Sequence, residues 1–254
     1  MVHSTRTTLS KEGRVIDEGP VSALAVRQRC FSRVERNADE RCRVGVVSVF
    51  AIRHGETEWS LNGRHTGITD IPLTDNGRRL AERLRSALTG QTFALVLVSP
   101  LQRARETCAR SGLADAAIIE PDLVEWDYGK YEGLTPKQIH ETAPGWLIFR
   151  DGCPGGESPG QVGARVDRVI ARAREAKGDV ALFAHGHVLR VLVARWLGLP
   201  AAAGQHFLLD TGTLSVLGFY RGIPAVKTWN APLREAAPPS AGREPAAMAR
   251  TMMP

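Results

Sequence analysis

Three short, almost wholly apolar runs divide the middle of the chain, at residues 46–52, 93–98 and 179–184. They lack the strict alternation of a half-exposed strand, so each predicts a strand that is buried on both faces of a sheet. Between these runs, apolar residues recur every third or fourth position, as on one face of a helix. Alternating strands and helices predict an α/β fold of three layers, in which helices flank a mostly parallel sheet.

Local signals indicate where the helices begin and where the sheet is completed. The stretches SPLQ at 99–102 and SPGQ at 158–161 place serine at a cap, proline at the first helical position and glutamine at the third. This order is typical of a helix N-terminus. A further helical pattern follows Thr74. Apolar stretches at 214–220 and 225–229 predict two closing strands.

Shifts in composition divide the chain into three zones. Residues 1–45 are polar and Arg-rich, which predicts a flexible N-terminal extension, and residues 231–254 are rich in alanine and proline, which predicts a disordered tail. Residues 46–230 are expected to form one domain. No apolar run suits a signal-peptide core or a bilayer span, so we expect a cytoplasmic location.

Charge and cysteine content exclude several classes of function. The chain has 33 Lys and Arg against 27 Asp and Glu, a net charge of +6. No basic stripe with interleaved aromatic residues accompanies that charge, so we expect neither a nucleic acid nor a membrane as partner. The four cysteines are scattered and form no C-x-x-C pair, which argues against a disulfide scaffold or a structural zinc site.

Basic and imidazole side chains follow the three predicted parallel strands. Arg53 and His54 follow the first strand, Arg103 lies just beyond the second, and His185 follows the third. Ligands of open α/β sheets bind outside the carboxyl ends of the strands, so we expect these four side chains to meet there. Arginine binds phosphate oxygens in pairs, and a neutral imidazole can attack phosphorus. The sequence therefore predicts a phosphoryl-transfer site.

Further residues are expected to support this chemistry. Glu125 lies among apolar neighbours and is the candidate general acid. Its rivals Glu56 and Glu132 are expected to orient neighbouring groups. His187 is expected to support His185. The remaining histidines, among them His3, His65, His140 and His206, are expected to have no role, and no metal ligand set is predicted because fixed cations stand beside the candidate ligands.

Five motifs occur in a fixed order: RHG at 53–55, TG at 66–67 with PLT at 72–74, SPLQRA at 99–104, E-x-x-YG at 125–129 and AHGH at 184–187. Together they resemble the histidine phosphatase superfamily, the phosphoglycerate-mutase-like fold. The segments at 146–157 and 183–190 are similar to the branch that holds fungal sedoheptulose-bisphosphatase and small bacterial acid phosphatases. The resemblance implies a metal-independent phosphomonoesterase that needs no cofactor and forms a phosphohistidine.

The resemblance also assigns roles residue by residue. It implies His54 as the nucleophile, Glu125 as acid and base, and a phosphate pocket of Arg53, Arg103 and His185. Family positions that face the phosphate or the substrate are matched here by Thr66, Gly67, Tyr128 and Gly186. Ser60 stands where related mutases have an asparagine that contacts the phosphate, and a serine there can donate one hydrogen bond. The partner would be a phosphorylated small molecule, and because this fold often pairs, a homodimer is an expectation as well.

Two other functions stay open at this point. A cofactor-dependent phosphoglycerate mutase is the first, although the interval from Glu125 to His185 is short and lacks the long basic insertion of such mutases. A binding module that senses a phosphorylated ligand without turnover is the second. Arg150, in the segment at 146–157, could meet a second phosphate, but a solvated loop charge is the plainer interpretation. The physiological substrate is left open.

Overall fold

The computed structural model describes residues 47–233, which hold a six-stranded sheet in the order β3-β2-β4-β1-β5-β6. Strands β3, β2, β4 and β1 run parallel, whereas β5 is antiparallel to β1 and β6 is antiparallel to β5. The prediction for residues 1–45 lies outside the described residues, as does that for the tail at 231–254 apart from its first three residues, of which Ala231 still belongs to the sheet. The strands are β1 Val49–Arg53, β2 Phe93–Val98, β3 Ala117–Ile119, β4 Asp179–Ala184, β5 Leu214–Tyr220 and β6 Ile223–Ala231.

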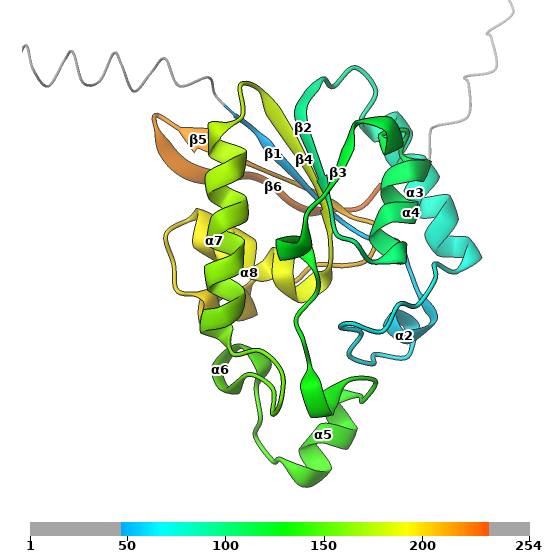
Figure 1. The fold of residues 1–254 in the computed structure, drawn as a ribbon, viewed down its shortest axis with the longest axis vertical. Helices are drawn as coiled ribbons and strands as arrows, with labels where there is room; N and C mark the ends of the chain where they lie inside the picture. Colours follow the sequence, from blue (N-terminus) through cyan, green and yellow to red (C-terminus); the bar gives the residue numbers. More distant parts are fainter. Residues whose placement is uncertain (1–46, 234–254) are drawn as a thin grey trace, which may run out of the picture. The chain divides into compact units, whose positions relative to one another are not determined.

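Helices cover both faces of this sheet, which confirms the predicted three layers. Figure 1 shows α3 and α4 on one side of the sheet and α7 and α8 on the other. The short helices α2, α5 and α6 lie toward one end of the strands. The helices are α2 Glu58–Leu61, α3 Asp75–Ala87, α4 Gln102–Arg110, α5 Pro136–Thr142, α6 Ile148–Asp151, α7 Pro159–Glu175 and α8 Gly186–Trp196, with 3-10 turns η1 Ala114–Ala116, η2 Pro121–Leu123, η3 Gly129–Tyr131 and η4 Ala201–His206.

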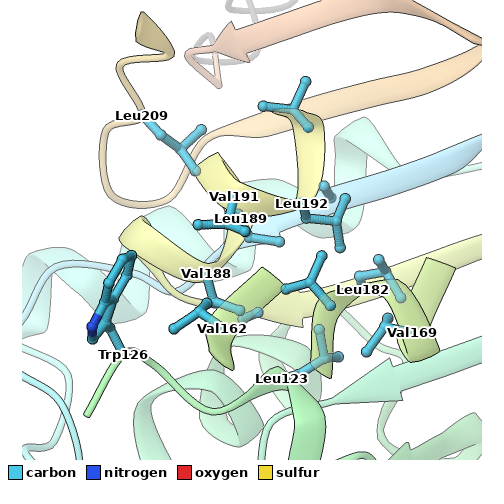
Figure 2. Close-up of a cluster of buried hydrophobic side chains, with 14 of the residues drawn as sticks. Leu123, Trp126, Val162, Val169, Leu182, Val188, Leu189, Val191, Leu192 and Leu209 are labelled. Carbon is cyan, nitrogen blue, oxygen red and sulfur yellow. The ribbon is translucent and has the colours of Figure 1, made fainter. Parts of the chain in front are cut away.

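The central strands bury both of their faces, as their sequences predict. Val49 and Ala51 of β1 pack into the cluster under α7 and α8, whereas Phe50 and Ile52 pack into the cluster under α3 and α4. Burying one such side chain stabilises the fold by roughly 1.5–3 kcal/mol, so the strands cannot shift register without losing a core. Figure 2 shows the larger cluster, which includes Val162, Val169, Leu182, Val188, Leu189, Val191 and Leu192.

The two predicted serine caps have different outcomes. Ser158 caps α7 and forms a capping box with Gln161, as predicted. The prediction for Ser99 is wrong, because α4 begins at Gln102 after Leu101 and no side chain caps it. The Ser99 N–H donates to the Phe183 carbonyl at 3.0 Å, which keeps this residue at the end of the sheet. Its hydroxyl lies 2.7 Å from Nε2 of the buried His185, which directly follows β4, instead of capping α4.

The strand order brings three strand ends together. Strand β4 lies between β2 and β1, and all three run in the same direction. The pairing continues past the strands, since the His54 N–H donates to the Ala184 carbonyl at 3.0 Å. The residues that directly follow β1, β2 and β4 therefore share one edge of the sheet.

Candidate active site

Two imidazoles meet at this edge. His54 follows β1 and His185 follows β4, and their ring centroids are 5.0 Å apart. Both side chains are buried, with exposed fractions of 4% and 0%. The predicted meeting of these rings is found in the structure, although the residues lie far apart in the sequence.

Hydrogen bonding defines the tautomer of His54. Its Nδ1 atom lies 2.7 Å from the carbonyl oxygen of Gly55. A carbonyl oxygen only accepts, so Nδ1 carries the hydrogen and Nε2 keeps its lone pair. Burial, followed by the charges of Arg103 and Arg53, holds the pKa of His54 well below the usual 6.5. The ring is therefore neutral at neutral pH, as predicted, and Nε2 can act as a nucleophile.

His185 is held at both ring nitrogens. Its Nδ1 accepts a hydrogen bond from Nε of Arg103 at 3.0 Å, and its Nε2 lies 2.7 Å from Oγ of Ser99. Arg103 can only donate, so the proton of the neutral ring lies on Nε2 and points to Ser99. Burial and then Arg103 hold the pKa of His185 well below its usual value. Ser99 thus accepts the N–H of His185, although the family resemblance places His185 in the phosphate pocket.

The two arginines of the site use their N–H groups differently. Arg53 donates from Nη1 to the Leu209 carbonyl, and its buried Nε has no partner among the described residues. Burial lowers the pKa of both guanidiniums, and the nearby carboxylate of Glu125 opposes that effect at each. Arg103 instead makes four bonds within the protein, to Nδ1 of His185 and to the carbonyl oxygens of Thr66, Gly67 and Thr69.

Backbone N–H groups surround the carboxylate of Glu125, which is 5% exposed. Its Oε1 accepts from the N–H groups of Trp126 and Val188, both at 2.9 Å. Its Oε2 accepts from the N–H group of His187 at 3.0 Å. The sequence predicts apolar surroundings for Glu125. The structure differs, because α8 begins next to this loop and N–H groups of its first turn donate to the carboxylate. A helix N-terminus stabilises a carboxylate, so α8 fixes where Glu125 points.

The residues assigned to the substrate side do not share one role. Tyr128 is 2% exposed and its hydroxyl lies 2.6 Å from Nδ1 of His187. The hydroxyl of Ser60 completes a capping box with Thr57 in α2, and no contact with the histidine pair is found among residues 47–233. Thr66 and Gly67 present their carbonyl oxygens to Arg103.

Two glycines of the site are required by close packing. A Cβ on Gly55 would lie 2.4 Å from the carbonyl oxygen of Gly77, so only glycine fits there. A Cβ on Gly186 would lie 3.2 Å from the guanidinium of Arg53. Their small size brings the backbone of Gly77 and the side chain of Arg53 into position.

Sequence reasoning missed several residues that hold the site. Thr107 accepts from the Gly55 N–H at 3.0 Å and donates to the Arg103 carbonyl at 2.7 Å. Arg165 of α7 is buried and donates to carbonyl oxygens of the loop that carries Glu125. Ser99 could have been found by the rule that located His54, since it directly follows β2. Arg165 lies in a helix and gives no such signal.

The expected supporting roles of the remaining charged groups are also visible. Glu132 accepts from the N–H groups of Gly67 and Thr69, and Glu56 accepts from the hydroxyl of Thr74. Arg150 is exposed and pairs with Asp151. Within residues 47–233, no group of three or more His, Cys, Asp or Glu side chains is placed to hold a metal ion, and no helix there could cross a membrane.

Comparisons with known proteins agree with this geometry. The histidine phosphatase superfamily (branch 1) matches residues 49–232. The acid phosphatase of Mycobacterium tuberculosis (strain ATCC 25618 / H37Rv) is 44% identical over 177 residues, which are 68% of this chain and 86% of that protein. Sedoheptulose 1,7-bisphosphatase of Saccharomyces cerevisiae (strain ATCC 204508 / S288c) is 37% identical over 180 residues, 58% of this chain and 66% of that protein. The solved structure of the open reading frame Rv3214 from Mycobacterium tuberculosis has a TM-score of 0.71 and 38% identity, and the match covers 74% of this chain and 99% of that one.

Proposed function

Because the chain belongs to branch 1 of the histidine phosphatase superfamily, we propose that its histidine pair hydrolyses phosphate monoesters through a phosphohistidine. The protein is an enzyme of the histidine phosphatase type. The observation that carries the mechanism is that His54 and Arg53 lie next to each other at the end of β1. There, a neutral His54 with a free Nε2 adjoins Arg53, whose buried Nε has no partner among the described residues.

In the first step, Nε2 of His54 attacks phosphorus in line with the ester oxygen. The N–P bond forms while the bond from phosphorus to the leaving oxygen breaks, and Glu125 gives that oxygen a proton. Arg53 donates from Nε and Nη2 to two phosphoryl oxygens, which stabilises the charge of the transition state. Arg103 adds its one remaining N–H, and the hydroxyl of Ser99, which accepts from the N–H of His185, donates to a third oxygen.

In the second step, water attacks the phosphohistidine. Glu125, now a carboxylate, takes a proton from this water, and the N–P bond breaks to release phosphate and restore neutral His54. Neither step needs a metal or an organic cofactor, since guanidinium groups supply the positive charge. This sequence of steps returns every group of the site to its starting state.

The substrate class follows from the relatives. We propose an acid phosphatase, or a phosphatase of sugar phosphates or bisphosphates, since the two curated relatives carry these names. A phosphoglycerate mutase is the alternative, and its product would be an isomer instead of free phosphate. A cytoplasmic location, a homodimer and the absence of nucleic-acid binding stay predictions from the sequence.

A phosphate-release screen tests this function. Sugar phosphates, sugar bisphosphates, phosphoglycerates, nucleotides and 4-nitrophenyl phosphate are offered to the wild-type chain and to His54→Ala. We expect free phosphate from the wild type and a loss of at least about 10³-fold in the variant, because the substitution removes the ring nitrogen that attacks phosphorus. Equal turnover by the two proteins would disprove the assignment of His54. Conversion of 3-phosphoglycerate to the 2-isomer without phosphate release would establish the mutase instead.

A further inference from the structure

The loop that carries Glu125 is tied to the start of α8 by a pair of side chains. The hydroxyl of Tyr128, three residues after Glu125, lies 2.6 Å from Nδ1 of His187. The hydroxyl has no other hydrogen-bond partner among the described residues, and Tyr128 is 2% exposed. The mechanism above uses neither of these two side chains.

The two oxygens of Glu125 are not equivalent. Oε1 accepts two N–H groups, from Trp126 and Val188, whereas Oε2 accepts one, from His187. A carboxylate oxygen has about two lone-pair sites, so Oε2 keeps one free. The proton that Glu125 transfers therefore belongs on Oε2, and within residues 47–233 the backbone N–H of His187 is the one donor that orients this oxygen.

The rings around His187 keep it neutral and fixed. His65 stacks on Tyr128 with a centroid distance of 4.6 Å, and Phe149 lies 5.3 Å from the ring of His187. Burial, followed by Arg190 and His65, holds the pKa of His187 well below its usual value. Gly67 lies against the same ring, where an added Cβ would be only 2.9 Å from Tyr128. A neutral, closely packed His187 can orient Glu125 without exchanging protons with it.

We propose that His187 is a positioning residue for the proton transfer, held by Tyr128 so that its N–H directs Oε2 of Glu125 to the leaving oxygen. This inference rests on the proposed phosphatase function and extends it to two residues. Loss of the hydrogen bond between Tyr128 and the His187 ring does not remove the backbone N–H of His187. It does free the first turn of α8 to move, and this N–H moves with it. A shift of this kind weakens protonation of the leaving group more than it weakens phosphate binding.

Dependence on the leaving group tests the proposal. Alkyl alkoxides leave only with a proton, whereas 4-nitrophenolate leaves as a stable anion, so only the alkyl esters depend on Glu125 for departure. The measurement is kcat/KM for glycerol phosphate and for 4-nitrophenyl phosphate, since this constant reports on the first phosphoryl transfer. In His187→Ala and in Tyr128→Phe, we expect the alkyl-to-aryl ratio of kcat/KM to fall at least about tenfold.

Three controls make the outcome specific. His187→Asn places an amide near the position of Nδ1 and should restore most of the ratio. His206→Ala removes an exposed histidine at the end of η4 and should leave the ratio unchanged. The double variant should be no worse than either single variant, because both act through one bond.

The results separate this inference from the proposed function. A folded Tyr128→Phe with an unchanged ratio overturns the positioning role, and so does an equal loss toward both esters. If His187→Ala does not fold, Tyr128→Phe decides alone, since it removes only a hydroxyl group. Absence of phosphate release from every ester in the wild type would instead count against the proposed function.

Discussion

At the scale of single residues, the two arginines of the site do different work. Arg103 is fully buried and donates four hydrogen bonds to the protein, so at most one N–H is left for a ligand. Arg53 donates to one carbonyl, of Leu209, and its buried Nε has no partner among the described residues. Arg53 is therefore suited to bind two phosphoryl oxygens, whereas Arg103 holds the site together.

Lysine substitutions test this division. Arg53→Lys keeps the charge but loses the paired donors, so we expect kcat/KM to fall by about 10²–10³ with a small change in Tm. Arg103→Lys cannot reach four acceptors, so we expect both activity and Tm to fall. Phosphate-release kinetics and thermal unfolding of the two variants are the measurements. A large loss of Tm in Arg53→Lys alone would contradict the division.

At the scale of elements, α7 supports the loop that carries Glu125. Arg165 is buried at 6% exposure and donates to the carbonyl oxygens of Asp122, Val124 and Glu125. It also pairs with Glu157 at 2.8 Å. Helix α7 therefore holds the backbone of Glu125, whereas α8 holds its carboxylate.

Removing this support should cost both stability and turnover. Arg165→Met leaves one buried carbonyl group, two partly buried ones and one carboxylate without their donor, and we expect a loss of about 3–5 kcal/mol in the free energy of unfolding. Arg168→Met is the matched control, since Arg168 lies on the same helix and pairs with Asp122 at the surface. We expect at most about 1 kcal/mol there. Urea unfolding measures both values, and equal losses in the two variants would rule out a special role for Arg165.

At the scale of the whole molecule, buried neutral histidines make the fold sensitive to acid. Burial lowers the pKa of His65 from 6.5 to about 4, and burial together with nearby arginines lowers the pKa values of His54, His185 and His187. Below pH 6.5 the unfolded chain binds protons that the folded chain does not yet bind. The free energy of unfolding therefore falls as the pH drops from about 6.5 toward 4.

His65→Phe should remove one part of this acid sensitivity. A pKa difference from 6.5 to about 4 corresponds to about 3 kcal/mol, most of it lost by pH 4.5. Between pH 7 and pH 4.5, we expect the free energy of unfolding to fall by about 2 kcal/mol less in the variant than in the wild type. Urea unfolding at both pH values measures this difference. The exposed substitution His206→Phe should show no such difference. A difference of the same size in both variants would refute the assignment to His65.

The sequence determined the main strands and the family of this protein, because both signals are local. Apolar runs of five or six residues predict β2 and β4 at their observed bounds, and the residues that follow each strand reach one edge whenever the strands are parallel and adjacent. The five motifs likewise identify the family that the comparisons show. The nucleophile, the two arginines and Glu125 could therefore be named from the sequence as candidates.

Only the tertiary structure decided how these side chains are bonded. The hydroxyl of Ser99 binds His185 instead of capping a helix. The hydroxyl of Ser60 completes the N-terminal cap of α2, and the hydroxyl of Tyr128 binds His187. Most of these partners lie far from each other along the chain, on strands and helices that meet only when the sheet is assembled. A hydrogen bond depends on positions to within tenths of an ångström, and such positions are set by packing between elements, which no local pattern encodes.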